Sequence, residues 1–199
     1  MRLLRSILFL LLFPLVACSS LRTPLPLIEG PPPAALSSQV FVGYAQAFRF
    51  IQGNWVRDPG YDYEFLMLER RSADRWETVK DIHRRDPRYD GRAGSRDQTR
   101  YFVSRTSPSA GGGLDLSVEG TLGIGKGHEE PGGAGFLVEL TPAERGWFVP
   151  FDTIRIRQTR EATRGRFEET VDLFSRKDGR EIPFMRMQEE GAIYRPILP

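Results

Sequence analysis

Few residues in this chain have the types and spacing that catalysis requires. The two histidines, His83 and His128, lie among charged neighbours outside any recognisable catalytic motif. No serine lies in a Gly-x-Ser-x-Gly nucleophile elbow, so the sequence does not indicate a Ser-His-Asp set. Two histidines and one cysteine also disfavour a metal site built from these residues. We therefore expect no catalytic residue, no metal site and no cofactor, and the sequence favours a protein that is not an enzyme.

The glycine-rich stretch Gly120-Thr121-Leu122-Gly123-Ile124-Gly125-Lys126-Gly127 is one residue short of a phosphate-binding P-loop. A P-loop has serine or threonine after its lysine to bind magnesium, but Gly127 stands there. The following residues, 129–133, contain a proline and two glycines and do not predict the helix that would cradle phosphate. We interpret the stretch as a glycine-rich hairpin loop, and expect His128 and the two glutamates after it to be solvated.

The segment from Arg84 to Arg105 holds seven arginines with three aromatic residues among them. Interleaved aspartates argue against nucleic-acid binding and favour a mixed-charge loop. The alternative is contact with an anionic envelope surface, because guanidinium groups bind phosphate in a bidentate way. The residues that would make this contact are Arg84, Arg85, Arg88 and Arg92.

The amino terminus has the parts of a secretory signal peptide. Arg2 and Arg5 precede an apolar run from Ile7 to Ala17, and small residues follow. As a helix, this run of about eleven residues would cover roughly half of a ~30 Å hydrocarbon core, which disfavours a permanent membrane span. The segment therefore predicts export.

The end of this segment, Leu15-Val16-Ala17-Cys18, resembles the bacterial lipobox. The resemblance implies diacylglycerol on the sulfur of Cys18, cleavage after Ala17, and acylation of the new amino terminus, for example with palmitate. Cys18 is the only cysteine, which fits lipidation because a free thiol is a liability in an oxidising compartment. More than one acyl chain is needed for stable anchoring, and this modification supplies two or three. The alternative is an ordinary signal peptide followed by a chance cysteine.

The residue after the cysteine bears on the destination. In the lipoprotein sorting pattern of Gram-negative bacteria an aspartate there favours retention in the inner membrane, and this chain has Ser19. The resemblance therefore implies a lipid-anchored protein of the cell outer membrane that faces the periplasm, with the inner membrane less favoured.

Three parts follow from these observations: a lipoprotein signal peptide at 1–17, a lipidated cysteine with a proline- and serine-rich tether at 18–38, and a β-rich periplasmic domain at 39–199. Residues 19–38 hold five of the 15 prolines, a composition typical of extended polyproline II. A proline-rich ligand for a partner's groove is the alternative for this tether. Cleavage after residue 17 removes two arginines and no acidic residue, leaving 26 cations and 26 acids. The formal charge of +2 is thus a targeting signal and does not indicate nucleic-acid binding.

Beyond residue 39 the chain alternates apolar and polar residues with period two, as half-buried strands do. The clearest stretches are 61–67, 114–119, 136–140, 154–156 and 171–173. We expect turns at 58–60, 72–74, 90–91, 178–179 and 188–191, with the Asp178-Gly179 pair forming a tight hairpin. Thr141-Pro142-Ala143-Glu144 indicates at most one helical turn.

This pattern predicts an all-β fold: a single antiparallel β-barrel, half-barrel or sandwich of about 8–10 strands with at most short helical turns. The sequence shows no internal repeat and no second folded domain. Trp55, Trp76 and Trp147 are expected to anchor the core.

Gly53-Asn54-Trp55 resembles the Gly-x-Trp signature of lipocalins, small β-barrels that hold apolar ligands. That family places the signature at its first barrel strand, whereas an apolar segment from Val40 to Ile51 precedes it here. Arg186 and Arg195 are the candidates for the arginine that packs on the tryptophan. The resemblance implies a carrier whose ligand would contact Trp55, Phe65, Trp76 and Phe102.

The leading hypothesis is an outer-membrane-anchored lipoprotein with a non-enzymatic binding or envelope-assembly domain. Its partners would be the membrane, through Cys18, and an envelope protein or lipid ligand. A lipocalin-like carrier of a lipid or small apolar ligand is the first alternative, and a periplasmic hydrolase is the second.

Overall fold

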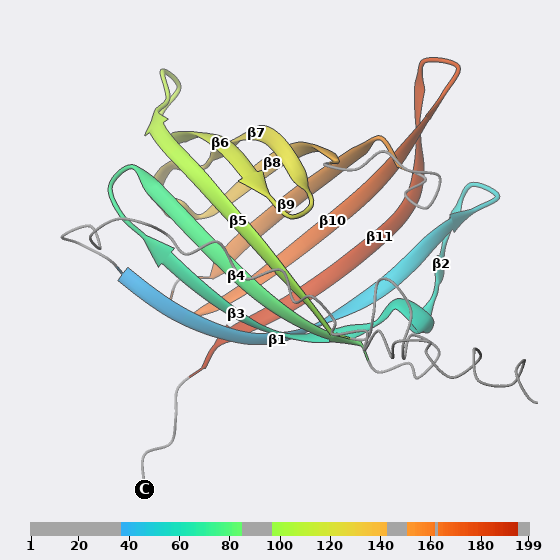
Figure 1. The fold of residues 1–199 in the computed structure, drawn as a ribbon, viewed down its shortest axis with the longest axis horizontal. Helices are drawn as coiled ribbons and strands as arrows, with labels where there is room; N and C mark the ends of the chain where they lie inside the picture. The colour runs from blue at the N-terminus through green and yellow to red at the C-terminus, as the bar shows by residue number, and fades with distance from the viewer. Residues whose placement is uncertain (1–36, 85–96, 143–150, 162, 195–199) are drawn as a thin grey trace, which may run out of the picture. The chain divides into compact units, whose positions relative to one another are not determined.

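The computed structural model describes residues 37–84, 97–142, 151–161 and 163–194. They form a single antiparallel β-barrel of ten strands, to which an eleventh short strand is attached (Figure 1). No α-helix occurs among these residues, and the helical turns are the 3-10 turns η1 (Pro59–Tyr61) and η3 (Pro131–Gly133). The all-β prediction is confirmed, and a closed barrel is the form that the domain takes.

The strands follow one another around the barrel in chain order, except that β2 stands aside. Their bounds are β1 (Ser37–Ile51), β2 (Asn54–Arg57), β3 (Tyr63–Arg71), β4 (Arg75–Arg84), β5 (Asp97–Pro108), β6 (Leu114–Gly120), β7 (Gly123–Glu129), β8 (Gly135–Pro142), β9 (Thr153–Glu161), β10 (Arg166–Lys177) and β11 (Arg180–Ile193). The barrel closes because β11 pairs with β1 from Phe41↔Ile193 to Arg49↔Met185. Full closure removes the sheet edges that an open antiparallel sheet would expose.

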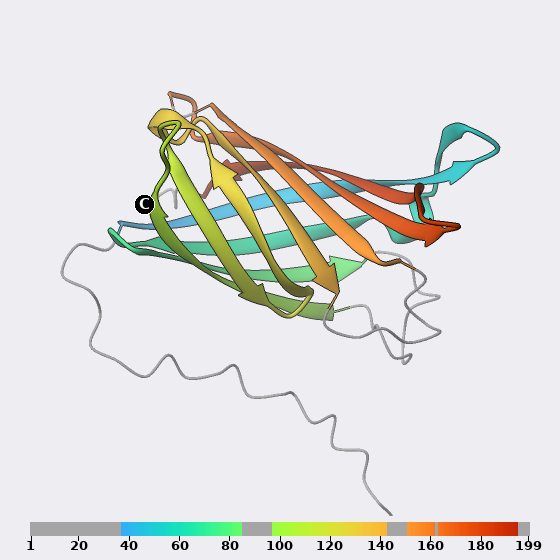
Figure 2. The same cartoon turned by 90° about the horizontal axis from the view of Figure 1, so that it is seen from above.

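Two hairpins extend beyond the barrel at the same end (Figures 1 and 2). In one, β2 pairs with the last four residues of β1, from Phe48↔Arg57 to Ile51↔Asn54. The other is formed by β10 and β11 and turns at Asp178 and Gly179, both with positive φ. The expected tight hairpin is confirmed at this turn, since a type I′ turn needs positive φ at both central residues.

The turns expected at 58–60 and 72–74 are also present, as η1 and as the β3–β4 connection. Residues 90–91 and Trp147 lie outside the described residues. The turn expected at 188–191 is wrong, because β11 runs through it while pairing with β10 on one side and β1 on the other. Thr141 and Pro142 end β8, and the two residues that would continue a helical turn are not described.

The loop expected at 120–127 is wrong for most of its length, since only Thr121 and Leu122 separate β6 from β7. The glycines of β7 alternate with Ile124 and Lys126. A Cβ atom on Gly125 would lie 1.9 Å from the backbone oxygen of Glu139, so β8 approaches β7 too closely for a side chain there. Backbone proximity, not mobility, accounts for this glycine.

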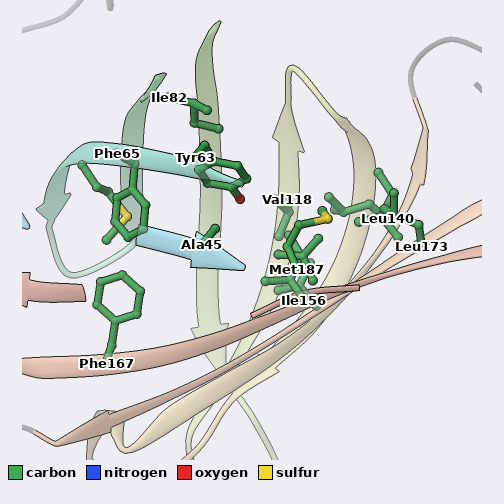
Figure 3. Packing of buried hydrophobic residues seen from close by; sticks show 14 of the residues in the cluster. Ala45, Tyr63, Phe65, Ile82, Val118, Leu140, Ile156, Phe167, Leu173 and Met187 are labelled. Atoms are coloured by element: carbon green, nitrogen blue, oxygen red, sulfur yellow. The ribbon is translucent and has the colours of Figure 1, made fainter. Parts of the chain in front are cut away.

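Aromatic rings fill the barrel where its first and last strands meet (Figure 3). Gly43 and Gly191 are directly paired across this seam. On its other side, Gly43 is paired with Phe65 of β3, and Gly191 is paired with Phe167 of β10. A Cβ on Gly43 would lie 2.4 Å from the ring of Phe65, and one on Gly191 would lie 2.3 Å from that of Phe167. The two glycines thus provide the space that the rings occupy. Phe41 completes the group, 5.3 Å from Phe167 between ring centroids.

Candidate functional site

Nine side chains inside the barrel form one continuous hydrogen-bonded chain, which we call the interior polar chain. In order, its members are Tyr63, Glu189, Lys80, Glu169, Gln158, Arg160, Glu69, Arg71 and Glu129. They come from strands β3, β4, β7, β9, β10 and β11, so their side chains meet only when the barrel has closed. Seven of them are buried and the two arginines are partly exposed.

Lys80 is the centre of the first half of this chain. Its ammonium donates to Glu189 at 2.6 Å and to Glu169 at 2.9 Å, and lies 4.9 Å from the centre of the Phe65 ring. The hydroxyl of Tyr63 donates to the other oxygen of Glu189. Every charged group in this half therefore has a charged partner, as buried charges require.

Two arginines around Glu69 form the second half. Arg160 donates to Glu69 through both terminal nitrogens, at 3.0 and 2.6 Å, and through Nε to Gln158 at 2.6 Å. Arg71 donates to Glu69 at 3.1 Å and to Glu129 at 2.6 Å. Bidentate pairing of this kind fixes the guanidinium planes and gives the chain its geometry.

The charges shift the pKa values of the buried groups in opposite directions. Burial alone would raise the pKa of Glu169, but Lys80, Gln158 and Arg160 hold it below its ordinary value. Burial and the neighbouring Glu169 raise the pKa of Glu189 despite Lys80. Burial lowers the pKa of Lys80 less than the two glutamates raise it, so the net shift is upward.

Burial and the Glu189 carboxylate raise the pKa of Tyr63 well above its ordinary value. A nucleophilic lysine or a basic tyrosinate needs a lowered pKa, and both groups here have the opposite shift. Lys80 therefore stays an ammonium and Tyr63 stays a phenol at neutral pH. The interior polar chain joins strands across the barrel and offers no activated nucleophile.

A cavity of about 60 Å³ lies beside the centre of the chain. Its polar lining includes Glu69, Lys80, Gln158 and Glu169, which belong to the interior polar chain. Its apolar lining consists of Met67, Trp76, Phe102, Leu116, Val118, Phe136, Val138 and Ile156.

Several contacts hold the indole ring of Trp76 in place. The guanidinium carbons of Arg71 and Arg160 lie 3.8 and 5.0 Å from its centre, and Phe136 meets it edge to face with centroids 4.9 Å apart. Cation–π and edge-to-face contacts each favour one orientation of the ring. The expectation that Trp76 anchors the core is confirmed.

The four residues proposed to contact a ligand do not all meet. Trp76 and Phe102 line the cavity, whereas Phe65 is buried in the barrel beside Lys80 and does not line it. Trp55 lies on β2, where it packs against Phe50 and not in the barrel core. The structure therefore brings together two of the four, Trp76 and Phe102, in one cavity.

One of the two arginines considered for Trp55 does contact it. The guanidinium carbon of Arg186 lies 4.5 Å from the Trp55 ring centre and its nitrogens bind Asp172 at 2.6 and 3.1 Å. Arg195 lies outside the described residues. The contact links β2 to β11, at a residue that is paired with Phe48 where β11 closes the barrel.

Of the four arginines proposed for an anionic surface, only Arg84 is described. It ends β4, and its guanidinium carbon lies 5.7 Å from the centre of the Tyr61 ring. Arg85, Arg88 and Arg92 lie outside the described residues, as does Cys18. His128 is half-buried on β7, with Nδ1 3.4 Å from Asp115, but the expectation that Glu129 is solvated is wrong, since it is buried against Arg71.

Sequence reasoning did not identify the interior polar chain, although alternation contained a signal for it. Glu69 continues the inward series of Tyr63, Phe65 and Met67, and Glu169 stands between Phe167 and Val171 on the apolar face of β10. A charged residue on the apolar side of an alternating strand indicates a buried charge that needs a partner. Which residue supplies the partner depends on strand order, which alternation leaves open.

None of the described residues belongs to a helix long and apolar enough to cross a membrane. Within the same residues, no three His, Cys, Asp or Glu side chains gather in a way that would hold a metal ion. Compared with known proteins, the chain matches no family model, no curated protein and no solved structure. Its function must therefore be inferred from its own geometry.

Proposed function

We propose that this protein is a lipid-anchored envelope lipoprotein whose barrel binds a protein partner through its outer wall. The anchor would be Cys18, the location the periplasmic face of the outer membrane, and the role non-enzymatic assembly. Ligand pockets for molecules of ordinary size have roughly 300–1,000 Å³. The cavity beside Trp76, at about 60 Å³, is too small for such a ligand and gives no support to the lipocalin-like carrier alternative.

The observation that carries the proposal is an apolar band on the outside of the barrel, across β1, β3, β4 and β5. Strand register places its members side by side in two rows: Val40, Leu68, Val79 and Tyr101, and beside them Val42 and Leu66. Val42 and Leu66 are directly paired and are 39% and 46% exposed. We call these six residues the outer apolar band. The other four are half-buried, and a contiguous apolar surface of this kind marks an interaction site.

The chemistry around the band favours a protein over a membrane surface as its occupant. Asp81 is the register partner of Leu66, and Glu64 and Glu190 are both paired with Tyr44, two residues along β1 from Val42. Carboxylates around an apolar patch would be repelled by anionic lipid headgroups, but they suit the polar rim of a protein interface. A tether from Cys18 to Ser37 would extend at most about 65 Å, which keeps the partner near the membrane.

Site-specific photocrosslinking in growing cells tests the outer wall. A photoreactive residue at Leu66 should give a discrete crosslinked protein, and Val42→Lys should abolish that product. Ile124 is the matched control, because it is 63% exposed on β7 but has Glu119 and Thr141 as its neighbours in register. Equal crosslinking from Leu66 and Ile124, or no crosslink at Leu66, would reject the band as the binding surface.

The anchor has an independent test. Cells grown with a clickable palmitate analogue should label the wild-type protein and not Cys18→Ala, while Ser19→Ala should stay labelled as the control. In envelope fractionation, the labelled protein should accompany the outer membrane, and Ser19→Asp should move it toward the inner membrane. Labelling of Cys18→Ala equal to that of the wild type would reject lipidation at this residue.

A further inference from the structure

The cavity beside Trp76 has a size and lining that point to a particular kind of occupant. At roughly 10–15 Å³ for each water, its volume of about 60 Å³ has room for about four waters or for a molecule of about four to six non-hydrogen atoms. Eight of its fourteen lining residues are apolar. An occupant with a carbon body would therefore be favoured over water alone along most of the wall.

Three residues with hydrogen-bonding side chains, Trp76, Thr78 and Ser104, line the cavity and do not belong to the interior polar chain. Trp76 is buried, and its indole Nε1 has no hydrogen-bond acceptor among the described residues. Ser104 is the residue directly opposite Trp76 on β5, and Thr78 follows Trp76 on the same face of β4. A buried indole nitrogen without an acceptor costs free energy, which an acceptor inside the cavity would recover. The two hydroxyls add further hydrogen-bonding capacity beside it.

The charges in the wall exclude an ionic occupant. Glu69, Lys80 and Glu169 line the cavity, but each is already paired with a charged partner in the interior polar chain. A carboxylate or ammonium that entered would have to break one of these pairs or remain buried without a counter-charge. Both costs are avoided by a neutral molecule.

We propose that this cavity is a binding site for a small neutral carbonyl compound, a ketone or amide of about four to six non-hydrogen atoms. Its carbonyl oxygen accepts a hydrogen bond from Trp76 Nε1, and its carbon body lies against the apolar wall formed by residues such as Leu116, Val118 and Val138. The site is separate from the outer apolar band and does not depend on lipidation, so either proposal can fail without the other.

The indole resonances of Trp76 and Trp55 in NMR spectra of the purified full-length protein provide the test. 2-Butanone, propionamide and propionate have similar shapes and the same number of non-hydrogen atoms. Of the three, only propionate is charged. At about 50 mM, a concentration suited to the weak binding of such small molecules, the two neutral compounds should shift the Trp76 resonance and saturate. Propionate should leave it in place, and Trp55, on the outer hairpin, should not respond to any of the three.

Variants of the wall complete the test. Ser104→Leu fills the cavity and should weaken 2-butanone binding by at least about tenfold, whereas Ser117→Leu, the same change at an exposed position of β6, should not affect it. Thr78→Val keeps the shape of the side chain, so the proposal can still be tested if Ser104→Leu does not fold. It should weaken binding of propionamide by about twofold to fivefold. No saturable shift of Trp76, equal binding of propionate, or unchanged binding in both cavity variants would overturn the proposal and leave water as the occupant.

Discussion

At the scale of single residues, the interior polar chain contains two glutamates on one lysine that are not equivalent. The pKa of Glu189 is raised, mainly by burial, so this carboxyl group is easier to protonate in the folded chain than in the unfolded chain. The pKa of Glu169 is lowered, because Lys80, Gln158 and Arg160 outweigh its burial. Lys80 is paired with both glutamates, and of the two Glu189 is the carboxyl group that better tolerates loss of its charge.

Glutamine substitutions should separate the two. At pH 7, Glu189→Gln should change the free energy of unfolding by less than about 1 kcal/mol, because a neutral group at this position keeps the hydrogen-bonding capacity toward Tyr63. Glu169→Gln should cost about 3–5 kcal/mol, since it removes the stronger partner of a buried ammonium. Urea unfolding followed by tryptophan fluorescence measures both, and equal losses would contradict the assignment.

The two carboxyl groups should also respond to acid with opposite signs. A raised folded-state pKa means that Glu189 adds stability as pH falls from its folded value toward about 4.3, its ordinary value. A lowered folded-state pKa means that Glu169 adds stability above that ordinary value and loses it as pH falls through the folded value. The stability difference between wild type and Glu189→Gln should therefore move in favour of the wild type as pH falls from 7 toward about 4.5, and Glu169→Gln should lose its disadvantage only at lower pH.

Alkaline pH tests Lys80 and Tyr63, whose pKa values are both raised. Each group contributes stability that is fully present when the pH is below its ordinary pKa of about 10. This contribution is lost as the pH rises toward the pKa of the group in the folded chain. Tyr63→Phe should cost about 1–3 kcal/mol at pH 8 and make the decline between about pH 10 and 11 shallower. Tyr101→Phe, on the outer apolar band, is the control for the loss of a hydroxyl group and should cost less than about 0.5 kcal/mol at pH 8.

At the scale of the elements, the seam between β1 and β11 depends on two paired glycines. Gly43→Ala or Gly191→Ala would place a methyl group within 2.4 Å of an aromatic ring carbon and should destabilise the barrel by about 1–3 kcal/mol. Gly111→Ala is the control, because its added methyl would meet no atom within 4 Å. Similar thermal unfolding midpoints for all three variants would show that the rings can move aside.

Alternation predicted the elements well where side chains exist to alternate. The strands containing Tyr63 to Met67 and Val171 to Leu173 follow from period two, and Asp178-Gly179 follows from the φ values that only such pairs adopt readily. Alternation was less informative at β7, where glycine occupies every second position from 123 to 127. Glycine has no side chain, so the pattern does not show which face of the strand is buried. Gln188 to Gly191 looked like a turn by composition, but pairing on both sides makes it strand.

The candidate site was predicted only in part for a related reason. Trp76 and Phe102 could be chosen as interior residues from their own strands. The partners of Lys80 lie 89 and 109 positions along the chain, on strands whose order around the barrel no local pattern specifies. Trp55 was assigned to the interior because a tripeptide resemblance does not reveal that β2 lies outside the barrel.

At the scale of the whole molecule, the two ends of the barrel chain meet. The backbone nitrogen of Tyr194 donates to the backbone oxygen of Val40 at 2.7 Å, and β1 and β11 are paired over nine residues. A circular permutant that joins residue 194 to residue 37 by a short linker and opens between Asp178 and Gly179 should therefore fold. Its circular dichroism should match that of the wild type, with a lower thermal midpoint because the β10–β11 hairpin is cut. Opening the chain within β4, between Val79 and Lys80, should instead prevent folding.

The pairing of the first strand with the last also governs how an exported chain would acquire its structure. Tyr44 and Glu190, which are hydrogen-bonded across that seam, are 146 positions apart. β1 can therefore pair with β11 only after nearly the entire polypeptide is present. Until then Lys80 has neither of its carboxylate partners, and the aromatic side of β3 has no opposing wall. Closure is thus a single late event, slow because it joins such distant segments. A truncated chain that lacks β11 would be left as an open sheet with unpaired edges, and we expect proteases to cleave it more readily than the closed barrel.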